Sequence, residues 1–280
     1  MPLVSNVSDT ARWVAVYRAW ETARPDALFK DPFAERLAGD RGRAIAQAVP
    51  LPARNGWPMI VRTKLIDDLI LASLAEGCGR VINLAAGLDT RPYRLNLPSS
   101  LSWVEADLPA MIDEKERLLA DANPGCELKR KKVDLIDPVA RSAFLKRATA
   151  DGKPTLVITE GLLIYLEEHA VRSLGRDLAS SPSIRWWIAD ILSRSVRWFI
   201  QTTMREHLVN APLKFAPQEG TALFESLGWR AREVRSLFKE AARLRRPPLY
   251  LRPFALLPDP DPRHPGNYPW AAVVRFERAA

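Results

Sequence analysis

A single glycine and several acids follow the apolar runs of this sequence. The run at residues 81–86 ends at Gly87, and a second run, at residues 101–107, ends at Asp107, twenty positions after the glycine. A glycine after a buried strand lets a ligand approach the backbone closely. An acid about twenty residues further on, at the end of the next strand, accepts hydrogen bonds from ribose hydroxyls. The spacing therefore predicts a site for a ribose-bearing cofactor.

The glycine turn also bears on which cofactor binds. Residues 85–91 read Ala-Ala-Gly-Leu-Asp-Thr-Arg, so the turn has a single glycine where the dinucleotide pattern G-x-G-x-x-G has several. A pyrophosphate needs close approach of the backbone at several of those positions, whereas S-adenosylmethionine has no phosphate. We therefore expect S-adenosylmethionine rather than NAD.

Two more acids, Asp134 and Glu160, follow the next predicted strands, at the sheet edge where ligands bind in open α/β folds. An acid after a strand can also form a turn or cap a helix, and this alternative stays open for Asp107 and Asp134. Glu160 lies inside the apolar run 155–166, where a carboxylate needs a partner. Of these acids, Glu160 therefore fits least well with a role that is limited to forming a turn or capping a helix.

Arg62 lies on the apolar stripe of a predicted helix, four positions before Ile66. An arginine on a buried helix face needs an anion, and its planar fork suits a carboxylate. Two partners are open: an acidic side chain of the protein, or the carboxylate of the methionine part of the cofactor.

Tyr165 and His207 are the candidate catalytic residues that could touch a methyl acceptor. Tyr165 lies five positions beyond Glu160, and its alternative interpretation is a buried tyrosine with a satisfied hydroxyl. His207 shares a helix face with Ile200 and Met204, and its alternative is a satisfied core histidine.

An α/β framework must bring these residues together. Strands and helices alternate between residues 81 and 192, which predicts a mostly parallel, doubly wound sheet with helices on both faces. The predicted strands are 81–86, 101–107, 127–134, 155–159 and 184–192, the helices between them are 109–122, 138–149 and 167–179, and earlier helices are expected at 8–22, from 31, and at 59–76.

The alternation stops after residue 192. We predict that residues 193–217 form a lid over the acceptor pocket and that Trp198, Phe199, Ile200 and Met204 cover apolar surface, because so many exposed aromatic and aliphatic groups are unfavourable. The alternative is that these residues pack against the N-terminal helix that carries Trp13 and Trp20 and do not move. A helix at 218–227, a strand at 229–234, a basic helix and a last strand at 270–278 follow. The predicted division is a helical N-terminal cap, 1–76, and a cofactor-binding core, 77–280.

The composition, 47% hydrophobic and 26% charged, is that of an ordinary globular protein. The net charge of +8 is spread over the chain, so we expect no nucleic-acid groove. Cys78 and Cys126 have no CxxC spacing, so neither a disulfide nor a metal site is expected. No signal pattern opens the sequence, and the longest apolar run is too short to span a bilayer, so we expect a cytoplasmic protein without membrane association.

An ordered set of motifs between residues 8 and 240 resembles the leucine carboxyl methyltransferase family, and more closely its bacterial branch of S-adenosylmethionine-dependent O-methyltransferases, which includes polyketide-tailoring enzymes. The resemblance implies a class I methyltransferase (Rossmann-like) fold whose last strand runs antiparallel next to the fifth, with a helical cap and an inserted lid. The motifs are Thr10-Ala-Arg, Arg18-Ala-Trp-Glu21, Asp31-Pro-Phe-Ala, Arg62-Thr-Lys, Ala86-Gly-Leu-Asp-Thr-Arg91, Glu105-Ala-Asp-Leu-Pro109 with Lys115, and Glu160-Gly-Leu-Leu-Ile-Tyr-Leu166.

The resemblance also implies roles for single residues. Arg62 would hold the cofactor carboxylate, Gly87 would line its methionine part, and Glu160 would face its amino end. Asp107 would bind the ribose hydroxyls, while Asp134 and Leu135 would frame the adenine. The full cofactor-binding set is Arg62, Ala86, Gly87, Asp107, Leu108, Asp134, Leu135, Glu160 and Gly161.

One position departs from the family, and two matching positions have a role that stays open. Members that methylate a protein phosphatase use a lysine where this chain has Ala11, which puts in doubt that this chain acts on a phosphatase tail. Asp89 and Arg91 belong to the family's turn, and both a structural ion pair and a ligand role stay open for them.

The expected function is S-adenosylmethionine-dependent methyl transfer to a carboxylate or hydroxyl oxygen of a small molecule of the secondary-metabolite type. A carboxylate is ionised at neutral pH and needs no base, whereas a hydroxyl needs one, such as His207. The chain has only three histidines, which favours a carboxylate or an acidic phenol. Two other functions stay open: a cofactor-binding protein without transferase activity, and a methyltransferase for the C-terminal carboxylate of a protein. The sequence does not indicate an oligomeric state.

Overall fold

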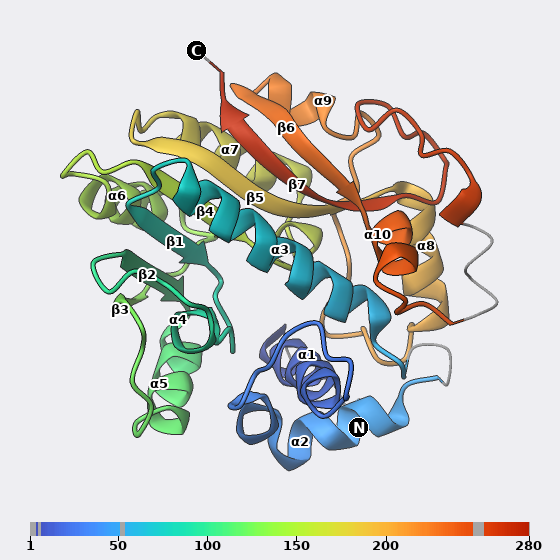
Figure 1. Ribbon diagram of the computed structural model, residues 1–280. Coiled ribbons are helices and arrows are strands. Elements are labelled where there is room, and N and C mark those ends of the chain that lie inside the picture. Colours follow the sequence, from blue (N-terminus) through green and yellow to red (C-terminus); the bar gives the residue numbers. More distant parts are fainter. Residues whose placement is uncertain (1–3, 5–6, 51–53, 249–254, 280) are drawn as a thin grey trace.

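The computed structural model describes residues 4, 7–50, 54–248 and 255–279. These residues form one large sheet with helices on both faces, and two N-terminal helices lie together beside it, at the bottom of Figure 1. Within the described residues, no helix is both long and apolar enough to cross a membrane.

Seven strands make up the sheet in the described part of the chain, in the order β3-β2-β1-β4-β5-β7-β6. Strands β1 to β5 pair in parallel, and β7 pairs antiparallel with both β5 and β6. The predicted fold class is therefore confirmed, with an antiparallel last strand beside the fifth. The strands are β1 (Arg80–Leu84), β2 (Ser102–Asp107), β3 (Glu127–Lys132), β4 (Thr155–Thr159), β5 (Ile184–Leu192), β6 (Trp229–Ser236) and β7 (Ala271–Arg278).

The helices follow the predicted alternation. They are α1 (Val7–Thr22), α2 (Ala34–Ala48), α3 (Trp57–Ala75), α4 (Arg91–Arg94), α5 (Pro109–Leu118), α6 (Pro138–Ala148), α7 (Glu168–Ala179), α8 (Arg194–Thr203), α9 (Ala222–Glu225) and α10 (Leu237–Arg243), with a short 3-10 turn, η2 (Leu163–Tyr165). The strand order reverses between β1 and β4, so the crevice beyond the carboxyl ends of these two strands is the expected place for a ligand.

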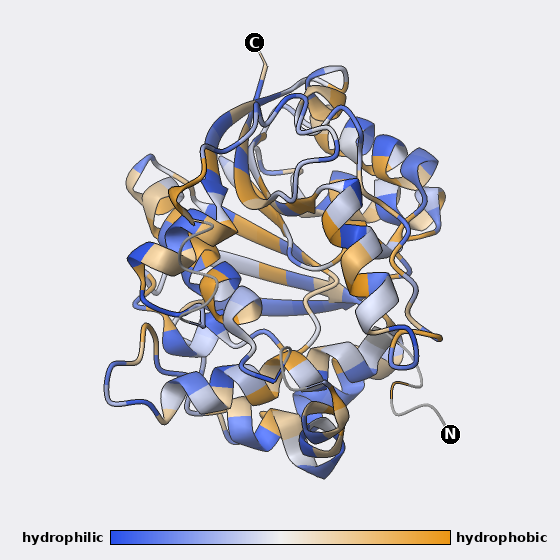
Figure 2. Cartoon of the chain, turned by 90° about the vertical axis from the view of Figure 1, so that its right-hand side faces the viewer, coloured by the Kyte–Doolittle hydropathy of each residue, from blue (hydrophilic) through white to orange (hydrophobic). Residues whose placement is uncertain are grey.

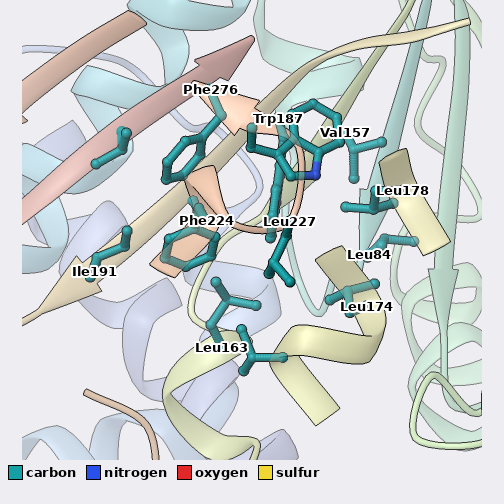
Figure 3. Packing of buried hydrophobic residues seen from close by; sticks show 14 of the residues in the cluster. Leu84, Val157, Leu163, Leu174, Leu178, Trp187, Ile191, Phe224, Leu227 and Phe276 are labelled. Carbon is teal, nitrogen blue, oxygen red and sulfur yellow. The ribbon is translucent and has the colours of Figure 1, made fainter. Parts of the chain in front are cut away.

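One face of the sheet packs against α6, α7 and α9. Trp187 of β5 is fully buried there, and its ring lies 5.3 Å from Phe224 and 5.6 Å from Phe276, centroid to centroid (Figure 3). Its indole nitrogen donates to the hydroxyl of Thr159 at 2.8 Å, so the buried N–H is satisfied. This aromatic cluster fixes β5 against β7 and α9.

The opposite face packs against α3 and α10. Ile66 and Leu69 of α3 and Leu237 of α10 share a cluster with Val81 and Leu156 of the strands. Neighbouring strand residues therefore point to opposite hydrophobic layers, and Figure 2 shows the hydrophobic residues concentrated along the strands in the middle of the molecule. Although the predicted cap ran to residue 76, α3 is one of the helices that cover the sheet.

The helices α1 and α2 pack against each other and close over the end of the sheet near β1. Val16 of α1 and Leu37 of α2 share an apolar cluster with Leu88, which follows the glycine turn, and with Met111 of α5. The N-terminal pair is thus attached directly to the turn that the sequence selects as the cofactor site.

The segment 193–217 packs in a different way from the one predicted. Met204 and Leu208 are buried in a cluster with Ile45 and Val49 of the N-terminal region, and Ile200 packs against this cluster. Trp198 and Phe199, however, are 67% and 59% exposed on the outer side of α8. The prediction that all four residues cover apolar surface is therefore wrong for Trp198 and Phe199, because α8 turns only one side toward the protein.

One predicted helix, 218–227, is shorter in the structure, where α9 covers only Ala222–Glu225. The backbone N–H of Thr221 donates to the carbonyl of Pro262, from the loop before β7, at 2.8 Å. A tertiary hydrogen bond thus replaces the helical one, and local sequence pattern does not reveal it.

Candidate functional site

The glycine turn after β1 and the acid that ends β2 are in direct contact. Gly87 adopts a left-handed conformation with φ of 46°, and Ala85 does the same with φ of 52°. The backbone N–H of Gly87 donates to one carboxylate oxygen of Asp107 at 2.7 Å, and the N–H of Leu108 donates to the other at 2.7 Å. Asp107 is therefore held against the turn rather than serving only as a helix cap.

The environment of Asp107 leaves it able to accept further hydrogen bonds. Burial raises the pKa of its carboxyl group, while the two backbone N–H groups lower it. Each carboxylate oxygen has two lone pairs, and each receives one backbone donor. The remaining lone pairs suit a ligand with two neighbouring hydroxyls, such as a ribose.

Residues after β3 lie beside Asp107. The backbone N–H of Val133 donates to the carbonyl of Asp107 at 2.8 Å, which brings the following Asp134 and Leu135 to the same edge of the sheet. Asp134 is exposed and accepts the backbone N–H of Ile136 at 2.9 Å, and Leu135 is partly buried. Leu108 is 49% exposed at the same sheet edge, so this region offers apolar surface of the kind that a flat ring covers.

Arg62, from α3, reaches the carboxyl ends of β4 and β5. Its Nε donates to Glu160 at 3.0 Å, and its Nη1 donates to Asp190 at 3.1 Å. The other oxygen of Asp190 accepts the backbone N–H of Gly161 at 2.7 Å. The structure thus gives Arg62 protein acids as partners; among the described residues, no hydrogen bond from its Nη2 is found, so this nitrogen can still meet a ligand carboxylate.

Gly161 follows Glu160 in a left-handed conformation with φ of 62°. A Cβ at this position would lie 3.4 Å from Nη1 of Arg62, which is an ordinary van der Waals contact, but any side chain would strain the left-handed backbone. Glycine is therefore favoured here by the conformation of the turn.

A buried ion-pair network continues from Glu160. Arg91 donates to Glu160 at 2.7 Å, to Asp89 at 3.0 Å and to Asp67 at 2.6 Å, and Arg94 also pairs with Asp67. Burial alone would raise the pKa of Glu160, but the charges of Arg91 and Arg62 outweigh it, and the pKa lies below its ordinary value. Glu160 is therefore ionised at neutral pH.

Asp89 and Arg91 form the structural ion pair that the sequence left open as one alternative. The amide of Asn83, in β1, also donates to Asp89 at 2.7 Å, so the turn after β1 is braced from within. The whole network links three guanidinium groups, on Arg62, Arg91 and Arg94, to four carboxylates, on Glu160, Asp190, Asp89 and Asp67. It therefore carries one surplus negative charge.

Tyr165 lies at the edge of this network, at the end of η2. Burial raises the pKa of its hydroxyl, and a hydrogen bond with Thr10 of α1 and the charge of Arg62 lower it. The net shift is upward, so Tyr165 keeps its proton at neutral pH.

His207 lies apart from these residues. Its Nε2 is 3.2 Å from the carbonyl oxygen of Ala48, at the end of α2. The imidazole therefore ties the segment after α8 to the N-terminal helices, and the structure does not bring it together with Tyr165 or Glu160 by any contact among the described residues.

Comparison with known proteins assigns the chain to a family. The family model described as leucine carboxyl methyltransferase matches residues 11–179, more than half of the chain. The chain belongs to the leucine carboxyl methyltransferase family. The matched region spans α1 to α7 and so contains the glycine turn, Arg62, Asp107 and Glu160.

Bacterial relatives of this chain are named as S-adenosyl-L-methionine-dependent methyltransferases. One, from Mycolicibacterium smegmatis, is 40% identical over 183 residues, which are 60% of this chain and 61% of the relative. One from Mycobacteroides abscessus is 35% identical over 191 residues, 63% of this chain and 62% of the relative. One from Streptomyces avermitilis is 38% identical over 183 residues, which are 61% of this chain and 63% of the relative. The aligned part of the chain thus spans about three fifths of the length of these relatives.

Two crystal structures share the fold at low sequence identity. A Thermobifida fusca protein described as a methyltransferase aligns with a TM-score of 0.55 and 18% identity, covering 86% of this chain and 89% of that one. A Streptomyces avermitilis protein of the DUF574 family aligns with a TM-score of 0.58 and 16% identity, covering 97% of both chains. At these identities the likeness establishes the methyltransferase fold of the family.

Sequence reasoning missed Asp190 and Asp67, the acids that pair with Arg62 and with Arg91 and Arg94. Asp190 had a usable signal, because it interrupts the apolar strand residues 186–191 just as Glu160 interrupts its own run. In the described part of the chain, no group of three or more histidine, cysteine or acidic residues could hold a metal ion.

Proposed function

We propose that this protein is an S-adenosylmethionine-dependent O-methyltransferase that methylates a carboxylate of a small molecule. We choose a carboxylate as the acceptor because none of the candidate bases around the site is free to take a proton. Glu160 and Asp190 are ion-paired, Tyr165 keeps its proton, and His207 faces a backbone carbonyl. An acceptor oxygen that is already ionised needs none of them.

The cofactor is S-adenosylmethionine, and the side chains described above fit it. Asp107 has lone pairs left for the ribose hydroxyls, Leu108 and Leu135 supply apolar surface for the adenine, and Arg62 retains a donor for the carboxylate. Ala86 and Gly87 form the close wall at the turn. The surplus negative charge of the ion-pair network suits a ligand whose sulfonium and ammonium groups are both cationic.

The bound cofactor supplies a methyl group that is already activated by its sulfonium. The chain's own task is to orient the acceptor and to exclude water. Tyr165, as a protonated hydroxyl near Arg62, can donate a hydrogen bond to the acceptor carboxylate and fix its direction. The helices α1 and α2 and the segment after α8 cover this region from outside.

The test is methyl transfer from a labelled cofactor to a mixture of small carboxylic acids and phenols. The product is then exposed to mild alkali, which hydrolyses methyl esters and releases labelled methanol but leaves methyl ethers intact. We expect alkali-labile label in an acid. Alkali-stable label would mean a hydroxyl acceptor, and would contradict the choice of a carboxylate.

Two other functions are weaker candidates. A methyltransferase for the C-terminal carboxylate of a protein would share the ester chemistry, but this chain has Ala11 where the phosphatase-methylating members have lysine. A Cβ at Gly87 would lie 3.3 Å from the Cβ of Ala11, so position 11 faces the cofactor turn. A cofactor-binding protein without transferase activity would bind S-adenosylmethionine and transfer no label to any acceptor.

A further inference from the structure

Arg18 connects the middle of α1 to the glycine turn. It is only 7% exposed, and its Nη2 donates to the carbonyl oxygen of Leu88 at 2.7 Å. Its Nε donates to the carboxylate of Asp31 at 2.9 Å. The guanidinium of Arg18 therefore donates hydrogen bonds both to Leu88, the residue after Gly87, and to Asp31, in the segment between α1 and α2.

Asp31 forms a second hydrogen bond with the turn. It is 2% exposed, and the oxygen that accepts from Arg18 also accepts the hydroxyl of Thr90 at 2.7 Å. Its other oxygen accepts the backbone N–H of Phe33 at 3.2 Å, which fixes the carboxylate at the start of α2. Thr90 itself is fully buried.

These contacts hold the turn from the N-terminal region of the chain. Asp89 is braced by Asn83 and Arg91, whereas Leu88 and Thr90 on either side of it are braced by Arg18 and Asp31. The turn needs such support because Ala85 is left-handed, an unfavourable conformation for a residue with a side chain. Burying an arginine and an aspartate also costs free energy, which the hydrogen bonds of both side chains offset here.

We infer that Arg18 and Asp31 are positioning residues for the cofactor: they hold Leu88 and Thr90, so that Gly87 keeps its backbone against Asp107 in the form that binds the ribose and the methionine part. The inference rests on the proposed function, and it gives Arg18 and Asp31, the first residues of two of the family motifs, a task at the cofactor turn. Neither side chain touches the cofactor in this role.

The test separates positioning of the turn from general stability. Arg18→Lys cannot reach both Leu88 and Asp31, and Thr90→Val removes the hydroxyl with little change of shape, whereas Thr90→Ser retains it. Glu21→Gln is the matched control, because Glu21 lies three residues after Arg18 on the same helix, is fully buried, and pairs with Arg246 at 2.7 Å away from the turn. Calorimetry gives the Kd for S-adenosylhomocysteine, and thermal unfolding gives Tm.

We expect Arg18→Lys to raise the Kd about tenfold and Thr90→Val to raise it several-fold, the size that loss of one buried hydrogen bond produces. Thr90→Ser should bind like the wild type, and Glu21→Gln should lower Tm with the Kd within about twofold of wild type. Wild-type Kd values for both Arg18→Lys and Thr90→Val would overturn the inference and leave the proposed function standing. Equal weakening in Glu21→Gln would also overturn it, since stability alone would then explain the effect. A wild-type protein that binds no S-adenosylhomocysteine would overturn the proposed function itself, and the inference with it.

Discussion

The backbone N–H of Gly87 donates to the carboxylate of Asp107 at 2.7 Å, across the twenty residues that separate the two in sequence. The contact joins the ends of β1 and β2, which are neighbours in the sheet. The acid that would bind the ribose is therefore itself oriented by the turn that would line the methionine part, so a change at either residue should affect both parts of the cofactor.

Asp107 should be the strongest single determinant of cofactor affinity. Asp107→Ala removes a charged acceptor for two hydroxyls, and we expect a loss on the order of 1.5–3 kcal/mol in binding free energy. Calorimetry with S-adenosylhomocysteine measures this, and NAD, which should not bind either protein, is the control ligand. An unchanged affinity in Asp107→Ala would contradict the assignment of the site.

Arg62→Lys should not be a conservative change. One ammonium cannot reproduce hydrogen bonds to both Glu160 and Asp190 and still leave a donor for the cofactor. We expect weaker cofactor binding together with a lower Tm. The control is Arg94→Lys, which disturbs the same network through Asp67 but lies further along it from Gly161. If Arg94→Lys weakens cofactor binding as much as Arg62→Lys does, Arg62 has only a structural role.

The rate of methyl transfer should be nearly independent of pH between about 6.5 and 9, because a carboxylate acceptor is already ionised and Tyr165, with its raised pKa, does not titrate there. Tyr165→Phe should lower kcat several-fold, as expected for one uncharged hydrogen bond, and leave the Kd for S-adenosylhomocysteine unchanged. A rate that rises with pH through this range would instead indicate a base or an acceptor hydroxyl that loses its proton.

Acid should destabilise the protein through the Glu160 network. The pKa of Glu160 is lowered in the folded state, so its contribution to stability is complete above the ordinary glutamate pKa of about 4.3 and is lost as the pH falls below it toward the folded value. Urea unfolding at a series of pH values measures how the free energy of unfolding changes with pH. Below about pH 4.5, the free energy of unfolding should change less steeply with pH in Glu160→Gln than in the wild type. If the free energy of unfolding has the same pH dependence in both proteins, Glu160 does not contribute.

The segment 193–217 should exchange its backbone hydrogens faster without cofactor than with it. The inner side packs against Ile45 and Val49, but no residue of α8 itself is fully buried, so its local opening should require little free energy. Hydrogen exchange with and without S-adenosylhomocysteine measures the difference, with α7 as the internal reference for a helix packed on the core. Equal protection in both states would mean that the segment is a static part of the wall.

The sequence predicted the α/β framework well where packing is uniform. The bounds of β4 and β5 agree with the predicted strands, because these central strands are largely buried on both faces and consist mostly of apolar residues. The ends of α9 and the exposure of α8 were not predictable, because a hydrogen bond from Thr221 to the distant Pro262 and the packing of only one side of α8 depend on segments far away in the chain.

The sequence by itself determined the positions of Gly87, Asp107 and Glu160, since strand ends, glycine turns and isolated acids in apolar runs leave local signals. Only the tertiary structure decided which charges meet: that Arg62 pairs with Glu160 and Asp190, that His207 faces Ala48, and that Arg18 reaches Leu88 from seventy residues away. The physical reason is that a buried charge requires a partner but does not specify one. The choice among acids of similar chemistry is made by which elements the packed core brings within hydrogen-bond distance.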